Sequence, residues 1–350
     1  MKFCIVDVSN LVHRAKHSVS RRDMSRNPYD PFGDLPQDDP DDLRVGLILT
    51  VVFSGLLNTF QKFDSDHCVA AFDSRSWRRD FMPEYKANRR DRVKTPQDVH
   101  DHELITRTID ELRDFLKEYT NVTVLEAPGA EADDFIGRWV QLHDDPAFSH
   151  VIMSADGDFK QLVRDEVDLY NPMTHVLYTM DGVFHQDGKK VKSTDRTVDR
   201  YGQVWKVKLD KKTKVPMEFD PEWELFEKCI RGDVSDNIRS AWPRVSTVRM
   251  KKAFYGSTED WNNFINSTWG TDGEKKSVRE LYDRNKTLID LSLQPEKIIS
   301  VIDDQIESEL DKELNRMVGS YFAKFCSKYS LSKLSQRADH FTNLLSLQYS

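Results

Sequence analysis

Nine acidic residues of this 350-residue chain stand where a fold can bring their side chains together: seven follow strand-like runs or open a helical pattern, and two lie much further on, within 232–237. They are Asp7, Asp73, Glu131, Asp133, Asp134, Asp156, Asp158, Asp233 and Asp236. Carboxylates that follow successive parallel strands meet at one edge of a sheet. Such clustered charges repel one another unless cations neutralise them, and carboxylate oxygens suit Mg²⁺. Because two divalent ions among carboxylates cleave phosphodiesters, the pattern predicts a metal-dependent nuclease.

Each acidic motif has a simpler explanation when it is taken alone. Asp156-Gly157-Asp158 can be a solvated turn, and Glu131-Ala132-Asp133-Asp134 can be an acidic helix start that complements the helix dipole. Asp7 or Asp73 can cap a helix. The occurrence of these motifs together, after several strand-like runs and in chain order, favours one shared site.

Strand-like runs alternate with helical patterns through the first half of the chain. The strands are expected over 2–7, 67–73, 122–125, 150–154 and 167–170, and the helices over 9–19, 43–63, 102–119 and 130–142. This alternation predicts an α/β fold with a doubly wound, mostly parallel sheet flanked by helices. Residues 176–217 contain short β-like runs and indicate an antiparallel hairpin insertion, and the chain is expected to be helical from 222 onward.

The composition fits a soluble globular protein, with 38% hydrophobic and 31% charged residues. The four cysteines are scattered, which favours a reduced, cytoplasmic location over disulfides or a zinc site. No signal peptide is recognisable at the N-terminus. The charge-free run over 45–60 is 16 residues long, which is short for a membrane span, so we expect a core helix and no membrane partner.

The net charge of −8 by itself argues against a nucleic-acid partner. The charge is unevenly distributed, however, and one segment of the chain is strongly basic. Residues 75–94 hold eight basic and three acidic residues, a local charge of +5. Lys86, followed by Arg79, is the best candidate for a catalytic cation at the scissile phosphate. Trp77, Phe81 or Tyr85 could stack on bases. The simpler alternative is a solvated basic face.

Five ordered blocks of the chain resemble the 5′-nuclease family, which includes flap endonucleases and the 5′-exonuclease domain of bacterial DNA polymerase I. The blocks are Val6–Ser9 with Arg14, Ala15 and His17; Phe72–Asp73 with Arg78–Asp80 and Pro83–Arg89; Glu131–Gly137; Ser154–Leu162; and Gly232–Ile238. The resemblance covers about residues 1–175 and 222–255. Residues 321–334 look more like the stand-alone RNase H-type 5′ nucleases of large tailed phages, which would place the protein in the host cytoplasm.

The resemblance implies a PIN-like, 5′-nuclease-like fold with a catalytic domain over 1–175, an arch over 75–97 and a helix-turn-helix-type duplex-binding module with C-terminal helices over 218–350. It implies two Mg²⁺ ions, for which Mn²⁺ can substitute. One ion activates water and the other stabilises the leaving oxygen. Asp7, Asp73, Glu131, Asp133 and Asp156 would surround the first ion. Asp158, Asp233 and Asp236 would serve the second, with Asp134 in an outer position.

The implied activity is that of a 5′→3′ exonuclease and flap endonuclease that removes primers in replication. Its substrates would be branched or 5′-tailed DNA and RNA–DNA hybrids, and its partners a single-strand-binding protein and a sliding clamp, with the protein itself a monomer. The candidate DNA contacts are Arg14, Arg78, Arg79, Tyr85, Lys86, Arg89, Arg90, Arg244, Arg249, Lys251 and Lys252. The chain departs from the family over 239–247, where a Gly-x-Gly hairpin that holds a monovalent ion is replaced by a run without glycine.

Three other functions compete with this interpretation. A PIN-type ribonuclease would share the acidic site but is usually compact, without an arch or a Gly-Asp-x-x-Asp-Asn helical module. A phosphatase on a doubly wound sheet wants Asp-x-Asp after the first strand, and Asp7-Val8-Ser9 lacks the second carboxylate. A non-catalytic DNA-binding module would explain the basic segment but not the nine carboxylates.

Overall fold

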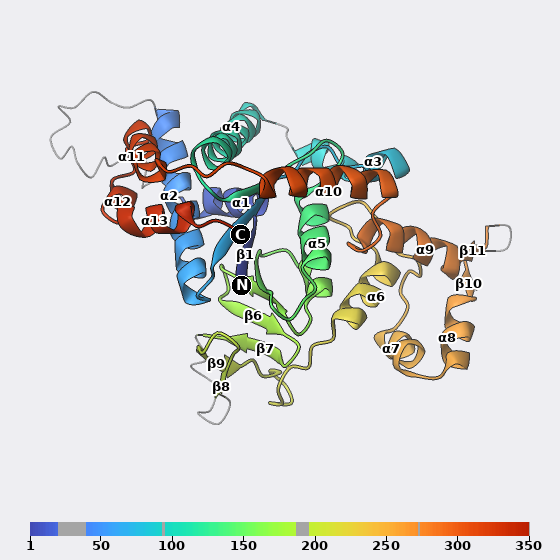
Figure 1. The fold of residues 1–350 in the computed structure, drawn as a ribbon. Coiled ribbons are helices and arrows are strands. Elements are labelled where there is room, and N and C mark those ends of the chain that lie inside the picture. The colour runs from blue at the N-terminus through green and yellow to red at the C-terminus, as the bar shows by residue number, and fades with distance from the viewer. Residues whose placement is uncertain (20–39, 93–94, 187–195, 272–273, 350) are drawn as a thin grey trace.

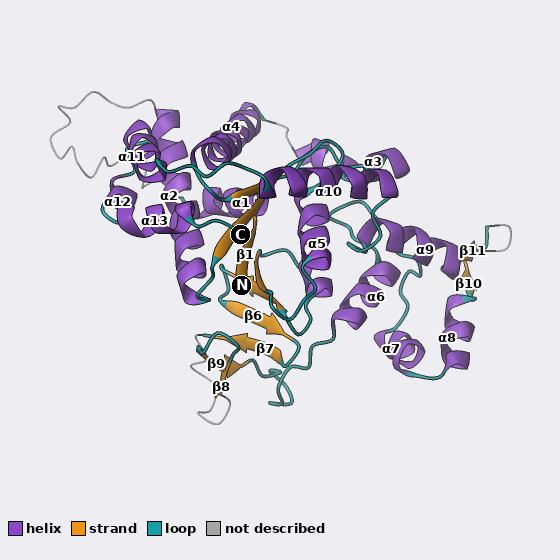
Figure 2. Ribbon diagram, in the orientation of Figure 1, coloured by secondary structure: helices purple, strands orange, loops and turns teal. Residues whose placement is uncertain are grey.

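A nine-stranded mixed sheet forms the centre of the computed structural model, which describes residues 1–19, 40–92, 95–186, 196–271 and 274–349 (Figures 1 and 2). The strand order is β3-β2-β1-β4-β5-β6-β7-β9-β8. The first five strands are parallel, and the last four extend the same sheet in antiparallel fashion. The predicted α/β class with flanking helices is confirmed, and the strands within 176–217 add to the main sheet.

The elements follow one another in the order that the strand and helix patterns predict for the first half of the chain. The strands are β1 (Lys2–Asp7), β2 (His67–Ala71), β3 (Thr123–Leu125), β4 (Ser149–Met153), β5 (Val167–Asn171), β6 (Val176–Thr179), β7 (Gly182–His185), β8 (Arg196–Val198), β9 (Val204–Val207), β10 (Thr268–Trp269) and β11 (Lys276–Ser277). The helices are α1 (Val8–Ser18), α2 (Pro40–Lys62), α3 (Arg78–Phe81), η2 (Ala87–Arg92), α4 (Pro96–Tyr119), α5 (Ala132–Leu142), η3 (Asp158–Leu162), α6 (Pro221–Arg231), α7 (Thr247–Tyr255), α8 (Thr258–Ile265), α9 (Val278–Ile289), α10 (Glu296–Leu310), α11 (Val318–Lys328), α12 (Ser332–Ser335) and α13 (Ala338–Ser346).

Both faces of the parallel sheet are buried, which explains why its strands are continuous apolar runs. In β1, Cys4 and Val6 face a core built with α1, α2, α4 and α11–α13. Phe3 and Ile5 alternate with them and face a second core built with α5 and α10. The carboxyl ends of β1, β2 and β4 lie at one edge of the sheet, because the three strands are parallel neighbours.

The apolar helix α2 is the one described helix that is long and apolar enough to cross a membrane. In this fold 56% of its apolar window is buried, against α1, α4, α12 and α13. Gly46 permits the closest approach, since a Cβ there would lie 2.5 Å from the carbonyl oxygen of Tyr329. The packing agrees with the predicted core helix.

The helical C-terminal segment divides into two parts: in Figure 1, α6–α9 lie at the right, whereas α10 crosses the upper middle and α11–α13 lie at the left. Helices α6–α9 form a core of their own around Trp223, Phe226 and Met250. Helices α10–α13 return to the sheet and complete its two cores, through Ile302 on one face and Phe322 on the other. The α6–α9 part alone is therefore positioned as a separate module beside the sheet edge.

Two buried histidines, His67 and His143, hold the C-terminal segment against the opposite end of the sheet. His67 contacts the carbonyl oxygen of Leu347 at 3.1 Å, and His143 contacts the hydroxyl of Tyr349 at 3.1 Å. Burial lowers the pKa of His67 to about 4 and that of His150 to about 3, and it lowers the pKa of His143 as well. These imidazoles are neutral in the folded protein, because protonation would place a charge among aromatic rings.

We expect the buried imidazole of His67 to contribute less to stability as the pH falls below about 6.5. An unfolded histidine takes up a proton near pH 6.5, whereas folded His67 does so only near pH 4. The contribution is therefore complete above pH 6.5 and is lost between pH 6.5 and 4, and the part of it that His67 has lost at pH 5 amounts to roughly 2 kcal/mol. Urea unfolding at pH 7.5 and pH 5 should show His67→Gln to be less pH-dependent than the parent protein by about this amount.

The exposed His102 provides the control for this comparison. His102→Gln should leave the difference between the two pH values unchanged. An equal pH dependence in His67→Gln and the parent protein would contradict the role of the buried imidazole.

Candidate metal centre

Three predicted site residues lie at the carboxyl ends of neighbouring strands. Asp7 ends β1, and Asp73 and Asp156 follow β2 and β4. Asp7 also caps α1, because its Oδ1 accepts from the amide of Asn10 at 3.0 Å. The Asp73 carboxylate accepts from the amide of Ala132 at 2.9 Å and so ties the end of β2 to the start of α5. These backbone bonds fix both carboxylates at the sheet edge.

Asp7, Asp73, Asp133 and Asp156 repel one another across this edge. Burial raises the pKa of Asp7 to about 8, and the charges of Asp73 and Asp156 add to the effect. Burial also raises the pKa of Asp133 well above its ordinary value, with Asp7 and Asp156 contributing. Among the described residues, no lysine or arginine forms an ion pair with any of the four. The group therefore carries negative charge that a bound cation would neutralise.

The structure corrects the prediction for Arg78, because this side chain is buried and cannot reach DNA. It is 2% exposed. Its guanidinium donates to the two oxygens of Asp134 at 2.8 and 3.0 Å and to Glu131 at 3.2 Å, and its Nε donates to the carbonyl oxygen of Leu288 at 2.7 Å. The planar fork of an arginine suits this bidentate contact. Asp134 is fully buried in the pair, so it is a structural partner of Arg78 and not a metal ligand.

A second correction concerns Tyr85, which was expected to contact DNA. It is 4% exposed, and its hydroxyl lies 3.1 Å from Glu131 and 3.0 Å from Asp236. Trp77 is also buried, at 6% exposure. Phe81, 51% exposed, is the one member of the three aromatic candidates that is open to a base.

Lys86 joins the strand edge to the acidic turn before α7. Its Nζ donates to Glu131 at 2.6 Å and lies 3.7 Å from Asp236. Burial opposes the charge on Glu131, but Lys86 and Arg78 outweigh it and hold the pKa of this carboxyl below its ordinary value. The Lys86 backbone has a φ of 54°, a left-handed conformation that costs energy in a residue with a side chain. Such strain is typical of positions that carry function.

The basic segment lies directly against the acidic turn over 233–238. The amide of Lys86 donates to the carbonyl oxygen of Asp236 at 3.0 Å, and Arg89 donates to the Asp236 carboxylate at 2.7 Å. Asn237 donates to the carbonyl oxygen of Glu84 at 2.9 Å. The side chain of Arg90 lies outside the described residues, as do residues 20–39 and with them most of the Pro- and Asp-rich run over 27–42 that was expected to be an exposed loop. An arch over 75–97 that encloses a single strand stays a prediction.

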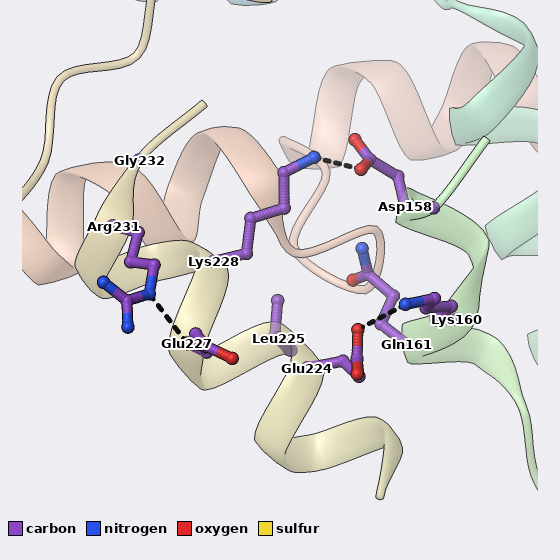
Figure 3. Close-up of a pocket in the computed structure, with 10 residues that line it drawn as sticks. Asp158, Lys160, Gln161, Glu224, Leu225, Glu227, Lys228, Arg231 and Gly232 are labelled. Atoms are coloured by element: carbon purple, nitrogen blue, oxygen red, sulfur yellow. Dashed lines mark hydrogen bonds and ion pairs between the residues drawn. The ribbon is translucent and has the colours of Figure 1, made fainter. Parts of the chain in front are cut away.

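One cation of the site, Lys228 of α6, is not indicated by any sequence motif. Its Nζ donates to Asp158, a contact drawn in Figure 3, and also to Asp233 at 2.7 Å. Burial would raise the pKa of Asp233, but hydrogen bonds from Lys228 and Ser235 lower it to about 2. Lys228 and Asp158 are 70 residues apart. No local motif could therefore have identified the pair.

The donor set suits hard divalent ions, although the side chains do not yet surround one. In their present rotamers, no three acidic, histidine or cysteine side chains of the described ranges are arranged to hold a metal ion. The carboxylates of Asp7, Asp73, Asp133 and Asp156 repel one another. The other carboxylates of the site contact lysines: Lys86 lies beside Glu131 and Asp236, and Lys228 lies beside Asp158 and Asp233. Carboxylate oxygens with a local excess of charge fit Mg²⁺ or Mn²⁺ by their chemistry. Binding of an ion would therefore require these side chains to change rotamer so that their oxygens surround it.

Four predicted DNA contacts of the helical module are exposed on or beside α7. They are Arg244, Arg249, Lys251 and Lys252. Arg249 lies over the ring of Trp242 at 4.1 Å, and Lys252 pairs with Asp260 at 3.1 Å. Arg244 has a φ of 60°, so the turn that lacks glycine still adopts a left-handed conformation. Arg14 on α1 is exposed and Arg79 is half-buried, which leaves both able to reach a substrate.

Comparisons with known proteins agree with the fold described above. The family model for the 5′-3′ exonuclease N-terminal, resolvase-like domain matches residues 2–190, more than half of the chain. Ribonuclease H of Enterobacteria phage T4 is 26% identical over 283 residues, which cover 78% of each chain. DNA polymerase I of Mycobacterium tuberculosis H37Rv is 28% identical over 287 residues, which are 79% of this chain and 27% of the polymerase. The chain thus spans about a quarter of that relative.

Solved structures of the bacteriophage T5 enzyme share the fold. The T5 5′-exonuclease with bound zinc ions superimposes with a TM-score of 0.57 at 19% identity, covering 89% of this chain and 99% of that one. The T5 flap endonuclease in complex with DNA and metal ions gives a TM-score of 0.56 at 18% identity, covering 89% and 98%. At this identity the likeness supports the sheet and the helical module as a fold.

Removing the buried Arg78 should destabilise the protein strongly. Arg78→Met leaves Asp134 and Glu131 without their buried counter-charge, and breaking a buried ion pair from one side costs about 3–5 kcal/mol. The free energy of unfolding in urea measures the loss.

The matched control is Arg75→Met, which removes an exposed pair with Asp80. An exposed pair is worth less than about 1 kcal/mol, so this variant should remain near the parent protein. Equal effects of the two substitutions would show that the Arg78 pair contributes no more than a surface contact.

Proposed function

The chain belongs to the 5′-3′ exonuclease family, and on that premise we propose that it is a Mg²⁺-dependent structure-specific nuclease. It hydrolyses phosphodiesters of DNA, and of RNA primers in RNA–DNA hybrids, at or near a 5′ end. One observation carries the proposal: mutually repelling carboxylates, with the pKa of Asp7 raised to about 8, lie at a sheet edge beside Lys86. In a protein that only binds DNA, such a cluster would repel the negatively charged phosphates and weaken binding.

Two divalent ions bound here would supply Lewis-acid activation of water and stabilise charge at the scissile phosphate. Asp7, Asp73, Asp133 and Asp156 would hold the first ion. Asp158 and Asp233 would hold the second. Glu131 and Asp236, which both contact Lys86, would be available as further ligands. Mg²⁺ is the expected ion because it accepts carboxylate ligands while keeping part of its water shell.

The basic residues around the edge have separate tasks in this proposal. Lys86 and Arg79 would orient the scissile phosphate, and Arg89 would hold the phosphate next to it. Phe81, half exposed on α3, offers a ring on which an unpaired base can stack. The four exposed cations of the helical module would hold the duplex through its phosphates without reading its sequence.

We further propose that the protein is a cytoplasmic monomer that works in primer removal beside a single-strand-binding protein and a sliding clamp. The relatives support the setting, because T4 ribonuclease H and DNA polymerase I share much of the chain.

With Mg²⁺ present, the protein should release short products from a 5′-tailed DNA duplex, and EDTA should abolish the release. Labelled substrates and gel electrophoresis measure this, and Mn²⁺ should restore activity. An RNA hairpin should be cut far more slowly. Preferential cleavage of the hairpin would favour the PIN-type ribonuclease instead, and no cleavage with either ion would defeat the nuclease proposal.

Replacing one ligand of the first ion should separate cleavage from binding. Asp156→Asn keeps the size of the side chain but removes a charge, so cleavage should fall by a factor of about 100 or more. The dissociation constant for the same DNA, measured by fluorescence anisotropy in Ca²⁺, should change less than about threefold. Asp165→Asn, at an exposed turn, is the matched control and should keep full activity. Unchanged cleavage in Asp156→Asn would favour a non-catalytic DNA-binding module.

A further inference from the structure

Lys228 occupies the position between two carboxylates that are expected to hold the second ion. Its ammonium group contacts Asp158 and lies 2.7 Å from Asp233. The side chain is 24% exposed, and the two carboxylates are 20% and 14% exposed. The contact is therefore largely shielded from water, where ion pairs are stronger than on the surface.

The two halves of the site differ in how their charge is balanced. Asp7, Asp133 and Asp156 have no lysine or arginine in ion-pair contact within the described residues. Asp158 and Asp233 share Lys228. A divalent ion entering the first half meets unbalanced negative charge, whereas an ion entering the second half meets charge that is already compensated.

We propose that Lys228 is the internal counter-ion of the second metal position and that an ion binds there only by displacing its ammonium group. This inference rests on the proposed two-ion site. Its consequence is ordered binding: the first ion binds tightly, and the second binds more weakly because it competes with a tethered lysine. Lys228 is a positioning residue in this role, since it acts through Asp158 and Asp233.

The structure provides space and a new partner for the displaced side chain. Lys228 lines a cavity of about 310 Å³ between η3 and α6 (Figure 3). Glu224 lies in the same cavity wall, one helical turn before Lys228. Carboxylates four residues before a lysine form favourable helix pairs. The Glu224 carboxylate already accepts from Lys160 at 2.8 Å, so an ammonium group that leaves Asp158 would share Glu224 with Lys160.

When no ion is bound, Lys228 should instead stabilise the second half of the site. Without Lys228, Asp158 and Asp233 would lie close together with no counter-charge, which destabilises a partly buried site. An ion would restore the balance. The lysine thus keeps the second half of the site folded when metal is scarce, at the expense of affinity for the ion.

The direct test compares Mn²⁺ binding to the parent protein and to Lys228→Met, without DNA, by electron paramagnetic resonance of free Mn²⁺. The parent should bind one ion tightly and a second weakly. Lys228→Met should bind the second ion at least about tenfold more tightly, a change of about 1.4 kcal/mol. Arg231→Met removes a positive charge from the same helix and lines the same cavity, so it controls for the general field and should change neither affinity by more than about twofold.

A second measurement uses the parent protein alone and does not depend on the variant folding. Reductive methylation followed by mass spectrometry reports how accessible the Lys228 amine is. Saturating Mn²⁺ should increase its labelling at least about threefold if the ammonium group leaves its two carboxylates. Labelling that stays equal or falls on addition of Mn²⁺ would overturn the proposal.

The outcomes distinguish this inference from the proposed function. A parent protein that binds no Mn²⁺ would defeat the two-ion nuclease and this inference together. Two bound ions with an unchanged or weaker second affinity in Lys228→Met would defeat only the role of Lys228.

Discussion

Electrostatic repulsion between carboxylates at one sheet edge is the constraint on which the rest of this structure depends. The parallel strands β1, β2 and β4 end side by side, so Asp7, Asp73 and Asp156 cannot avoid one another. Burial strengthens the repulsion and raises the pKa of Asp7 to about 8. This repulsion destabilises the fold unless bound cations or side chains of opposite charge balance it.

The chain supplies its own cations from segments that are distant in sequence. Arg78 and Lys86 come from the segment after β2, and Lys228 comes from α6 in the helical module. Each makes contact with acidic residues of another element: Arg78 with Asp134, Lys86 with Glu131, and Lys228 with Asp158. The site thereby couples the sheet to α6–α9. Removing one of these cations would therefore destabilise both the element that carries it and the element that it contacts.

Much of the sheet could be predicted from the sequence because strands buried on both faces are continuous apolar runs. The five parallel strands were placed within two residues of their observed ends. Helix α4 begins at Pro96 and not near 102, because Thr95 and Asp98 form a capping box that hydrophobic periodicity does not reveal. The acidic edge was predictable as well, since its residues follow directly on strands.

The direction of a charged side chain was not predictable. A basic segment such as 75–94 indicates positive charge but not which members turn inward, so Arg78 and Tyr85 were assigned to DNA while the fold buries both. Asp134 is expected in an outer position of the metal site, yet its helix position directs it to Arg78. Lys228 was overlooked because its partners are brought to it only by the docking of α6 beside η3.

The most direct measurement is diffraction from a crystal soaked in Mn²⁺, with an anomalous difference map at the manganese edge. The account predicts two peaks at about 2.0–2.2 Å from carboxylate oxygens, which is the distance expected for ions of this kind. One should lie among Asp7, Asp133 and Asp156, and the other between Asp158 and Asp233, where the Lys228 ammonium group lies in this structure. A map with no peak within coordination distance of these side chains would contradict the account.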